Sequence, residues 1–170
     1  MDTLLDSGKY SDMRITCQGR PWNVHRAVIC TASPVFAAMV DGKFKEAQSG
    51  VIDLPADEPE IVEMMLRFLY QGKYNDGRPT APIARGNASA SLDDRGGLKF
   101  PPGGKLREEA MVVNVKVYVM ADKYNIPILK QYARAKYKEI LNQVIAAAIT
   151  TSERGDIEFE CSVHCLQKNQ

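Results

Sequence analysis

The sequence predicts an α+β fold, in which short strands and helices form one domain interrupted by a long loop. Three observations lead to this prediction. Near the N-terminus, apolar and polar residues alternate as in strands, and helical periodicity follows. A stretch rich in glycine and proline occupies residues 75–105. Neither flank of that stretch contains enough periodic apolar sequence for a core of its own, so we expect both flanks to share one core.

Residues 13–24 are predicted to form a β-hairpin. Met13, Ile15 and Cys17 alternate with polar residues, as in a strand with one buried face. The sequence QGRP then supplies a turn before a second strand. A further short strand, VIDL, is expected at residues 51–54.

Two short helices are predicted after the hairpin. The first covers residues 25–32. The second begins with Ser33 as its N-cap and Pro34 at its first position, where a missing N–H costs nothing. Its apolar residues leave little polar face, so we expect it to be mostly buried.

A longer amphipathic helix is predicted to begin near Asp57. Asp57 and Glu60 have the spacing of a capping box. Gly72 can end the helix in a left-handed conformation. The apolar stripe of this helix consists of Ile61, Met65, Phe68 and Leu69.

Helices are also predicted after the loop. Residues 107–125 contain many valines, whose β-branching favours a strand. The length of the segment and its ending MADKYN favour a helix that stops at Asn125. Pro127 opens a further helix that we expect to continue to about residue 151. Its apolar face consists of Leu129, Tyr132, Ala133, Tyr137, Ile140 and Leu141.

Residues 75–105 are predicted to be a flexible insertion. They hold six of the 12 glycines and four of the nine prolines, without apolar periodicity. Burial in such a segment cannot offset the entropy of ordering it. We therefore place the domain at residues 1–150, interrupted by this insertion, and a C-terminal tail at residues 151–170.

The composition argues against several classes of partner. The chain has 22 Lys and Arg against 21 Asp and Glu, so its net charge of +1 offers no basic footprint for nucleic acid. No apolar run approaches the roughly 18 residues of a membrane span. The N-terminus lacks the pattern of a signal peptide. We expect no nucleic-acid or membrane partner, four free thiols, and a location in the cytoplasm, the nucleus or both.

The order of short motifs resembles the BTB/POZ domain family. The motifs are SDMRITCQGRPWNVHRAVICTASPVFAAM, GKFKEA, VIDLPADEP, FLYQGKY and VYVMADKYNIPILK. The resemblance covers residue 11 to about residue 141. The long insertion before the ADKY helix is similar to that of single-BTB proteins of filamentous fungi. The resemblance implies a helical cluster flanked by a short, mostly three-stranded sheet, and no catalytic chemistry.

The resemblance also implies a protein–protein interaction module. Family members form homodimers, bind cullin scaffolds as substrate adaptors of ubiquitin ligases, or recruit transcriptional co-regulators, and membership does not select among these. Many cullin-binding members carry a hydrophobic-x-Glu element that Phe44, Lys45 and Glu46 match. Asp122 and Tyr124 would flank the same surface. The alternative is that Phe44 packs under its own loop, and that Asp122 and Tyr124 only end a helix and fill the core.

Three further sets of residues have roles implied by the family. Asp12 and Arg26 match two charged positions that lie close together and line a partner groove in some members. His25 would satisfy backbone groups where the second strand enters the first helix. Leu4 and Leu5 are candidate contacts of a homodimer. Because the short N-terminal arm supplies little of the 1,200–2,000 Å² that a stable interface buries, a monomer, a homodimer and a heteromer all stay open.

A small thiol or metal enzyme is the contrasting class. His25 could act as a base for Ser33 or Cys30, but the sequence has neither a nucleophile elbow nor a glycine-rich phosphate loop. Three ligands of a kind that zinc takes stand near the C-terminus: Cys161, His164 and Cys165. A closed zinc site needs a fourth ligand. We therefore predict a protein that is not an enzyme and needs no cofactor or metal.

Overall fold

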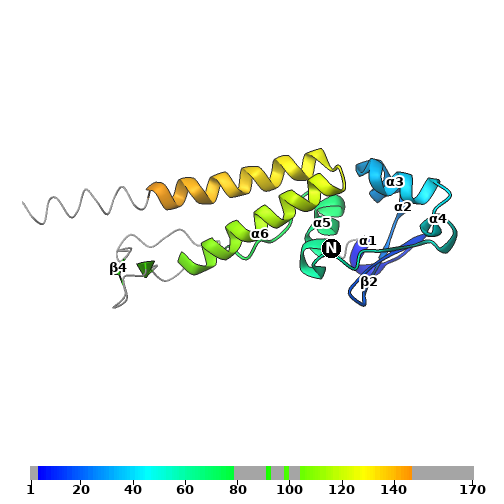
Figure 1. Cartoon of the computed structure of the whole chain (residues 1–170), viewed down its shortest axis with the longest axis horizontal. Coiled ribbons are helices and arrows are strands. Elements are labelled where there is room, and N and C mark those ends of the chain that lie inside the picture. The colour runs from blue at the N-terminus through cyan, green and yellow to red at the C-terminus, as the bar shows by residue number, and fades with distance from the viewer. Residues whose placement is uncertain (1–3, 79–90, 93–97, 100–103, 147–170) are drawn as a thin grey trace, which may run out of the picture. The chain divides into compact units, whose positions relative to one another are not determined.

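The structure is a computed structural model that describes residues 4–78, 91–92, 98–99 and 104–146. The described residues form the predicted α+β fold, with short and long helices and a three-stranded sheet (Figure 1). The chain divides into two compact units, Met1–Asp76 with Val112–Ala135, and Gly77–Met111 with Lys136–Gln170. The sheet and the residues predicted to form the partner surface all belong to the first unit.

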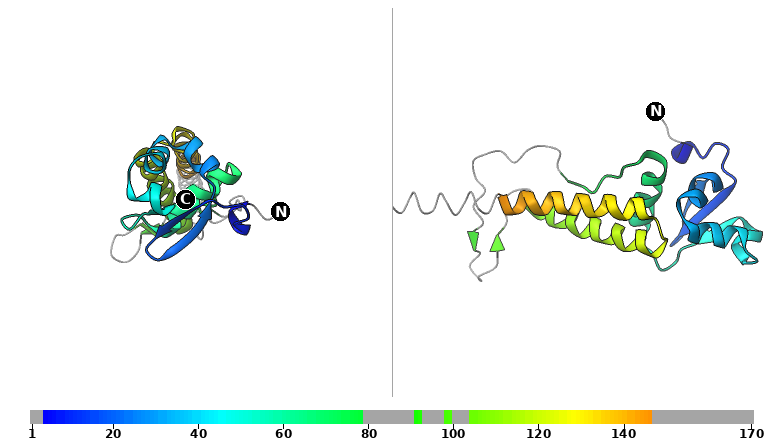
Figure 2. Two further views of the ribbon diagram at one scale, coloured as in Figure 1. Left: turned by 90° about the vertical axis from the view of Figure 1, so that its right-hand side faces the viewer. Right: turned by 90° about the horizontal axis from the view of Figure 1, so that it is seen from above.

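The three-stranded sheet has β1 (Met13–Cys17) at its centre. The neighbour β2 (Arg20–Val24) pairs with β1 antiparallel, which confirms the predicted hairpin (Figure 2). The other neighbour, β3 (Val51–Asp53), pairs with β1 parallel. The predicted alternation is confirmed, because the buried side chains of β1 are Met13, Ile15 and Cys17.

The next two helices follow the sequence prediction closely. Helix α2 spans Arg26–Ala32 and helix α3 spans Pro34–Asp41. Ser33 is the N-cap of α3, and its Oγ accepts a hydrogen bond from the N–H of Phe36 at 3.1 Å. Two side chains fix α3 in the core, since Phe36 is fully buried and Val40 nearly so.

A short helix that the sequence prediction missed connects α3 to the sheet. Helix α4 spans Lys45–Ser49 and ends at Gly50, whose φ of 66° is left-handed. Five residues make little more than one turn, so α4 has no periodic apolar face by which it could have been recognised. The segment begins just after Phe44, which is the N-cap of α4.

Helix α5 (Pro59–Gln71) follows β3 and is amphipathic as predicted. It ends at Gly72, whose φ of 70° confirms the predicted left-handed cap. The predicted capping box is wrong, because Glu58 is the N-cap and makes no side-chain cap bond. Most of the predicted apolar stripe is buried or packed against the core: Ile61, Met65 and Phe68 are buried and Leu69 is partly buried.

The valine-rich segment is a helix, as its length predicts. Helix α6 spans Gly104–Lys123, and the backbone of Asn125 turns left-handed with a φ of 49°. Residues 127–146 are also helical. Within the first unit, the end of α6 and the start of the next helix share one core with the sheet and α5. The buried side chains that join them there include Val117, Ala121, Leu129 and Ala133.

The predicted insertion holds some regular structure. Strand β4 (Ser91–Leu92) pairs antiparallel with β5 (Leu98–Lys99), and the first residues of α6 also fall within it. Composition did not predict this pair, because strands of two residues leave no periodicity to detect. The rest of the insertion, and the tail predicted at residues 151–170, lie outside the described residues. In the described ranges, no helix has both the length and the apolar character that crossing a membrane requires.

Candidate functional site

The segment after α3 presents the predicted partner element to solvent. Phe44 is 61% exposed, a large fraction for an apolar ring. Lys45 is exposed and Glu46 is half-buried, both in the first turn of α4. Lys43, on the other side of Phe44, is exposed as well. The ring is thus an apolar group among charged side chains, which is the arrangement of an interface anchor with a polar rim.

The two residues predicted to flank this surface have different surroundings. Asp122 is exposed, and its carboxylate accepts a hydrogen bond from Lys130 Nζ at 2.5 Å. Tyr124 is only 2% exposed, and its ring stacks on Phe36 with centroids 4.6 Å apart. A partner cannot reach a side chain at that depth, so the structure places Tyr124 in the core and leaves Asp122 on the surface.

The hydroxyl of Tyr124 donates to a carboxylate that links three parts of the chain. Asp57 accepts this bond at 2.5 Å and also accepts from Lys123 Nζ at 2.7 and 2.9 Å. The backbone carbonyl of Asp57 accepts from Gln18 Nε2 and from Cys17 Sγ. Burial, and then the hydrogen bond and charge of Asp57, raise the pKa of Tyr124 far above its usual range. Asp57 is thus occupied by residues distant in sequence, which explains why it forms no capping box.

Ser33 connects α3 to the same core residues. Besides accepting from Phe36, its Oγ donates to the backbone carbonyl of Tyr124 at 2.5 Å. The side chain is fully buried. The sequence predicted the cap but not this second bond, which joins residues 91 positions apart.

The predicted charged pocket of Asp12 and Arg26 is not formed by their side chains. Asp12 Oδ1 accepts from the backbone N–H of Arg26 at 2.8 Å, at the start of α2. The guanidinium of Arg26 pairs instead with Asp41 at 3.1 Å. The two residues lie close together through the backbone of Arg26: the Asp12 carboxylate accepts from an N–H at a helix N-terminus, where negative charge is stabilising.

His25 is the N-cap of α2, but its side chain makes no cap bond where β2 enters that helix, which is the role the family resemblance implies. It bonds instead to one backbone group before β1. Its Nε2 faces the carbonyl of Lys9 at 2.8 Å. Because a carbonyl only accepts, Nε2 donates to it, and Nδ1 lies 2.8 Å from the hydroxyl oxygen of Tyr70. The same hydroxyl accepts from the backbone N–H of His25. The ring thereby fixes the turn in which Tyr10 adopts a left-handed φ of 63°, a rare conformation for a bulky residue.

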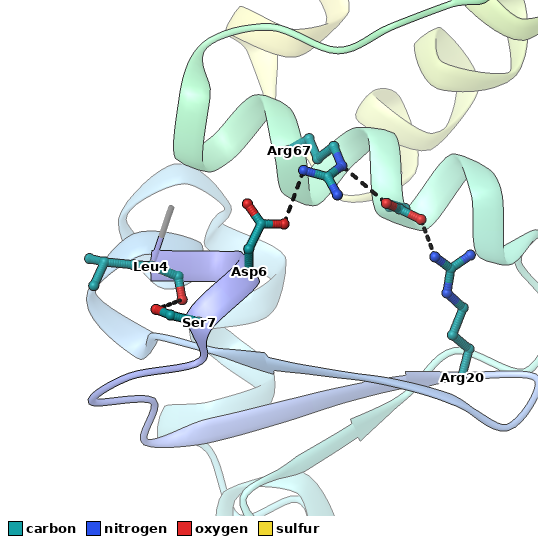
Figure 3. A network of polar contacts seen from close by, with 6 residues as sticks. Leu4, Asp6, Ser7, Arg20 and Arg67 are labelled. Carbon is teal, nitrogen blue, oxygen red and sulfur yellow. Dashed lines mark hydrogen bonds and ion pairs between the residues drawn. The ribbon is translucent and has the colours of Figure 1, made fainter. Parts of the chain in front are cut away.

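The N-terminal helix α1 (Leu4–Ser7) is tied to the rest of the first unit by ion pairs. Asp6 pairs with Arg67 of α5, Arg67 with Glu63, and Glu63 with Arg20 of β2 (Figure 3). These groups line a shallow cavity of about 330 Å³. Because each charge has an opposite partner in this chain of contacts, the cavity holds no uncompensated charge with which to attract an ion.

The two candidate dimer contacts in α1 lie on different sides of it. Leu5 is 8% exposed and belongs to the core, so its side chain offers no surface to a second copy. Leu4 is 48% exposed. Only Leu4 is therefore placed where a dimer contact could form.

The hydrogen bonds of His25 and Ser33, two of the residues considered for catalysis, go to other groups. Nδ1 of His25 contacts the hydroxyl of Tyr70, and Nε2 contacts the carbonyl of Lys9. The hydroxyl of Ser33 bonds to the backbone of Tyr124 and of Phe36. Burial raises the pKa of the Cys30 thiol, and the nearby charge of Asp41 raises it further. A thiol with a raised pKa is a weaker nucleophile at neutral pH.

A metal site is also without support in the described part of the chain. There, no group of three or more His, Cys, Asp or Glu side chains could hold a metal ion. Burial and then the charge of Asp57 raise the pKa of Cys17, which disfavours the thiolate that binds metals. The three C-terminal candidates lie outside the described residues: Cys161, His164 and Cys165.

Comparison with known proteins points to one family. The family model described as BTB/POZ domain matches residues 1–88. "Armadillo BTB Arabidopsis protein 1" of Arabidopsis thaliana is 27% identical over 131 residues, 76% of this chain. "ARM repeat protein interacting with ABF2", from the same plant, is 32% identical over 68 residues, 40% of this chain. The matches span 18% and 10% of the lengths of these two relatives.

Among solved structures, the BTB domain of human Gigaxonin is similar. It is 12% identical, with a TM-score of 0.44, and the match covers 75% of this chain and 77% of that one. The relatives named above are plant proteins, so the resemblance to fungal single-BTB proteins is not confirmed. BTB/POZ domains are interaction modules that bind protein partners, often dimerise and are generally not enzymes. Since the family model matches more than half of its 170 residues, this chain belongs to the BTB/POZ domain family.

Proposed function

We propose that this chain is a substrate adaptor of a cullin-type ubiquitin ligase, and that Phe44 is the anchor of its cullin surface. The observation that supports this proposal best is the exposure of the Phe44 ring, at 61%, in the hydrophobic-x-Glu element. A phenylalanine that stays at the surface contributes little to the core. Aromatic side chains that become buried in an interface supply much of its binding energy.

The surroundings of Phe44 fit an anchor better than a core residue. Lys43 and Lys45 are exposed on either side of it, and Glu46 follows in the first turn of α4. Asp122 is also an exposed residue of the proposed surface, whereas Tyr124 is buried in the core. The proposed contact set is therefore Phe44, Lys45, Glu46 and Asp122.

Mixing the purified chain with a cullin N-terminal domain tests this proposal. Light scattering after size exclusion would give the mass of any complex at concentrations of tens of micromolar. A complex with a one-to-one or two-to-two mass supports the adaptor function and gives its stoichiometry. Absence of any mass shift would reject it, provided that each protein alone elutes as a folded species.

The second candidate is a scaffold or co-regulator module without ubiquitin chemistry, acting as a homodimer or in a heteromer. The exposure of Leu4, at 48%, favours a contact through α1. One relative is named "ARM repeat protein interacting with ABF2", and a role in binding another protein would suit this chain. If light scattering of the chain alone gives the mass of a dimer, this candidate is favoured. Leu4→Asp places a charge in the proposed contact and should then give the mass of a monomer.

We also propose a kinship with fungal single-BTB proteins and a location in the cytoplasm, the nucleus or both. Microscopy of the chain tagged with a fluorescent protein would test the location.

A further inference from the structure

Gly42 ends α3 two residues before Phe44. Its N–H donates to the carbonyl of Ala38 at 3.2 Å, and its backbone has φ −81° and ψ −170°. Residues of every type adopt such an extended conformation. The backbone conformation therefore gives no reason for glycine at this position.

Space, rather than conformation, requires glycine at position 42. A Cβ built there would lie 2.7 Å from the carbonyl oxygen of Ala38 and 2.8 Å from Cδ2 of Phe44. It would also lie 3.1 Å from Cε2 of the same ring. Carbon atoms in favourable contact are about 3.5–4.0 Å apart. Any side chain at Gly42 would therefore displace the Phe44 ring, the last turn of α3, or both.

We propose that Gly42 is the positioning residue of the Phe44 anchor. The bare backbone of Gly42 forms a seat for the edge of the ring that carries Cδ2 and Cε2, while Phe44 as a whole stays 61% exposed. The seat restricts the orientations that the exposed ring adopts before binding. A preorganised side chain loses less entropy when a partner orders it. This inference rests on the proposed function, because it assigns to Gly42 a part in presenting the same anchor.

The seat can be tested without a partner. Aromatic ring currents shift nearby protons, so the two α-protons of Gly42 should have chemical shifts displaced by the Phe44 ring. Replacing the ring in Phe44→Leu should return both shifts to ordinary glycine values. Unchanged Gly42 shifts in Phe44→Leu would overturn the inference, whether or not any partner binds.

Binding measurements on Gly42→Ala distinguish a role in positioning the Phe44 ring from a role in stabilising α3 alone. Gly42→Ala should weaken binding of the cullin N-terminal domain about tenfold, as loss of a well-placed anchor does. In a Phe44→Ala background, Gly42→Ala should weaken it no further, because the two changes act through one ring. Equal weakening in both backgrounds would mean that Gly42 supports only α3, and would overturn the inference.

Gly50→Ala is the matched control. Gly50 has a left-handed φ of 66°, and a Cβ there would meet nothing within 4 Å. This variant should lower the melting temperature through backbone strain but leave affinity and the Gly42 shifts unchanged. If Gly50→Ala weakens binding as much as Gly42→Ala does, general destabilisation explains both and the inference fails.

Failure of the proposed function gives a different pattern. If Phe44→Ala binds the cullin domain as tightly as the unmodified chain, the cullin surface is wrong, while the proton shifts still decide whether Gly42 seats the ring. If Phe44→Ala weakens binding and Gly42→Ala does not, the function stands and the positioning role is rejected.

Discussion

The two ends of α3 lie in different surroundings. At its N-terminal end, Ser33 is fully buried and its hydroxyl bonds to both Phe36 and Tyr124. Beyond its C-terminal end, Phe44 is 61% exposed and rests on Gly42. Buried hydrogen bonds are therefore found at the N-terminal end of α3. A large apolar ring lies at the surface just after its C-terminal end.

We propose that this difference separates residues that stabilise the fold from residues that bind a partner. A buried hydroxyl with two bonds leaves unsatisfied groups behind when it is removed, so its effect is on stability. Removing an exposed ring costs little folding stability, so its removal should mainly weaken binding of a partner. The variants below test this separation in order of decreasing expected effect on stability.

The largest effect is expected at Ser33. Ser33→Ala removes the α3 cap and leaves the carbonyl of Tyr124 without this donor, so it should lower the free energy of unfolding by about 2–4 kcal/mol. Urea denaturation followed by circular dichroism measures this. Ser49→Ala is the control, since the Ser49 hydroxyl makes only exposed bonds to Val51. Equal losses in both variants would contradict the importance assigned to the buried end of α3.

The next effect is expected at Tyr124. Tyr124→Phe keeps the stack on Phe36 but removes the bond to Asp57, which should cost about 1–3 kcal/mol at neutral pH. Denaturation at pH 7 measures this cost.

The pH dependence of stability should also change in Tyr124→Phe. The folded chain raises the pKa of Tyr124 above its ordinary value of 10.0, first by burial and then through Asp57. The folded state therefore holds this proton more tightly than the unfolded state does. The stabilisation is complete below pH 10 and is lost as the pH rises further. Between pH 10 and 11, the melting temperature of Tyr124→Phe should fall less steeply than that of the unmodified chain. Parallel curves would contradict this role.

A smaller effect is expected at His25. His25→Ala removes the bonds to Lys9 and Tyr70 and should cost about 1–2 kcal/mol, because Lys9 is exposed and can bond to water while Tyr70 is half-buried. It should also release the turn that holds Tyr10 at a φ of 63°. Faster amide exchange at residues 9–11 would show this release. Unchanged exchange would mean that the turn is held by other contacts.

The smallest effect on stability is expected at the lysines beside Phe44. Lys43 and Lys45 are both exposed, so changing both to Ala should alter the free energy of unfolding by no more than about 0.5 kcal/mol. The salt dependence of binding to the cullin domain should weaken, because charges at the rim of an interface are screened by salt. Lys73→Ala, at another exposed lysine, is the control. An unchanged salt dependence in the double variant would place these lysines outside the interface.

Local signals in the sequence predicted most of the fold. The Ser33 cap with Pro34, the left-handed Gly72 and the stop at Asn125 are short-range features, and the structure contains all three. The alternation in β1 likewise predicted which side chains are buried. Such features depend on neighbours within a few residues, so they can be recognised without the tertiary structure.

Long-range contacts explain the differences from prediction. Asp57 was expected to cap α5, but Lys123 and Tyr124 bind its carboxylate from 66 and 67 residues away. Arg26 was expected to meet Asp12, but Asp41 lies within reach of its guanidinium. A local sequence pattern cannot predict which of several distant side chains will bond to a given charged group. The seat of Phe44 on Gly42 was missed for another reason: a glycine in extended backbone gives no sequence signal.

A paired measurement on Phe44→Ala tests most directly whether Phe44 serves a partner or the fold. Its melting temperature should fall by no more than about 4 °C, while its affinity for the cullin N-terminal domain should fall at least about tenfold. Thermal unfolding by circular dichroism and titration calorimetry give the two values on one preparation. A fall of about ten degrees or more, or an unchanged affinity, would show that Phe44 serves the fold and not a partner.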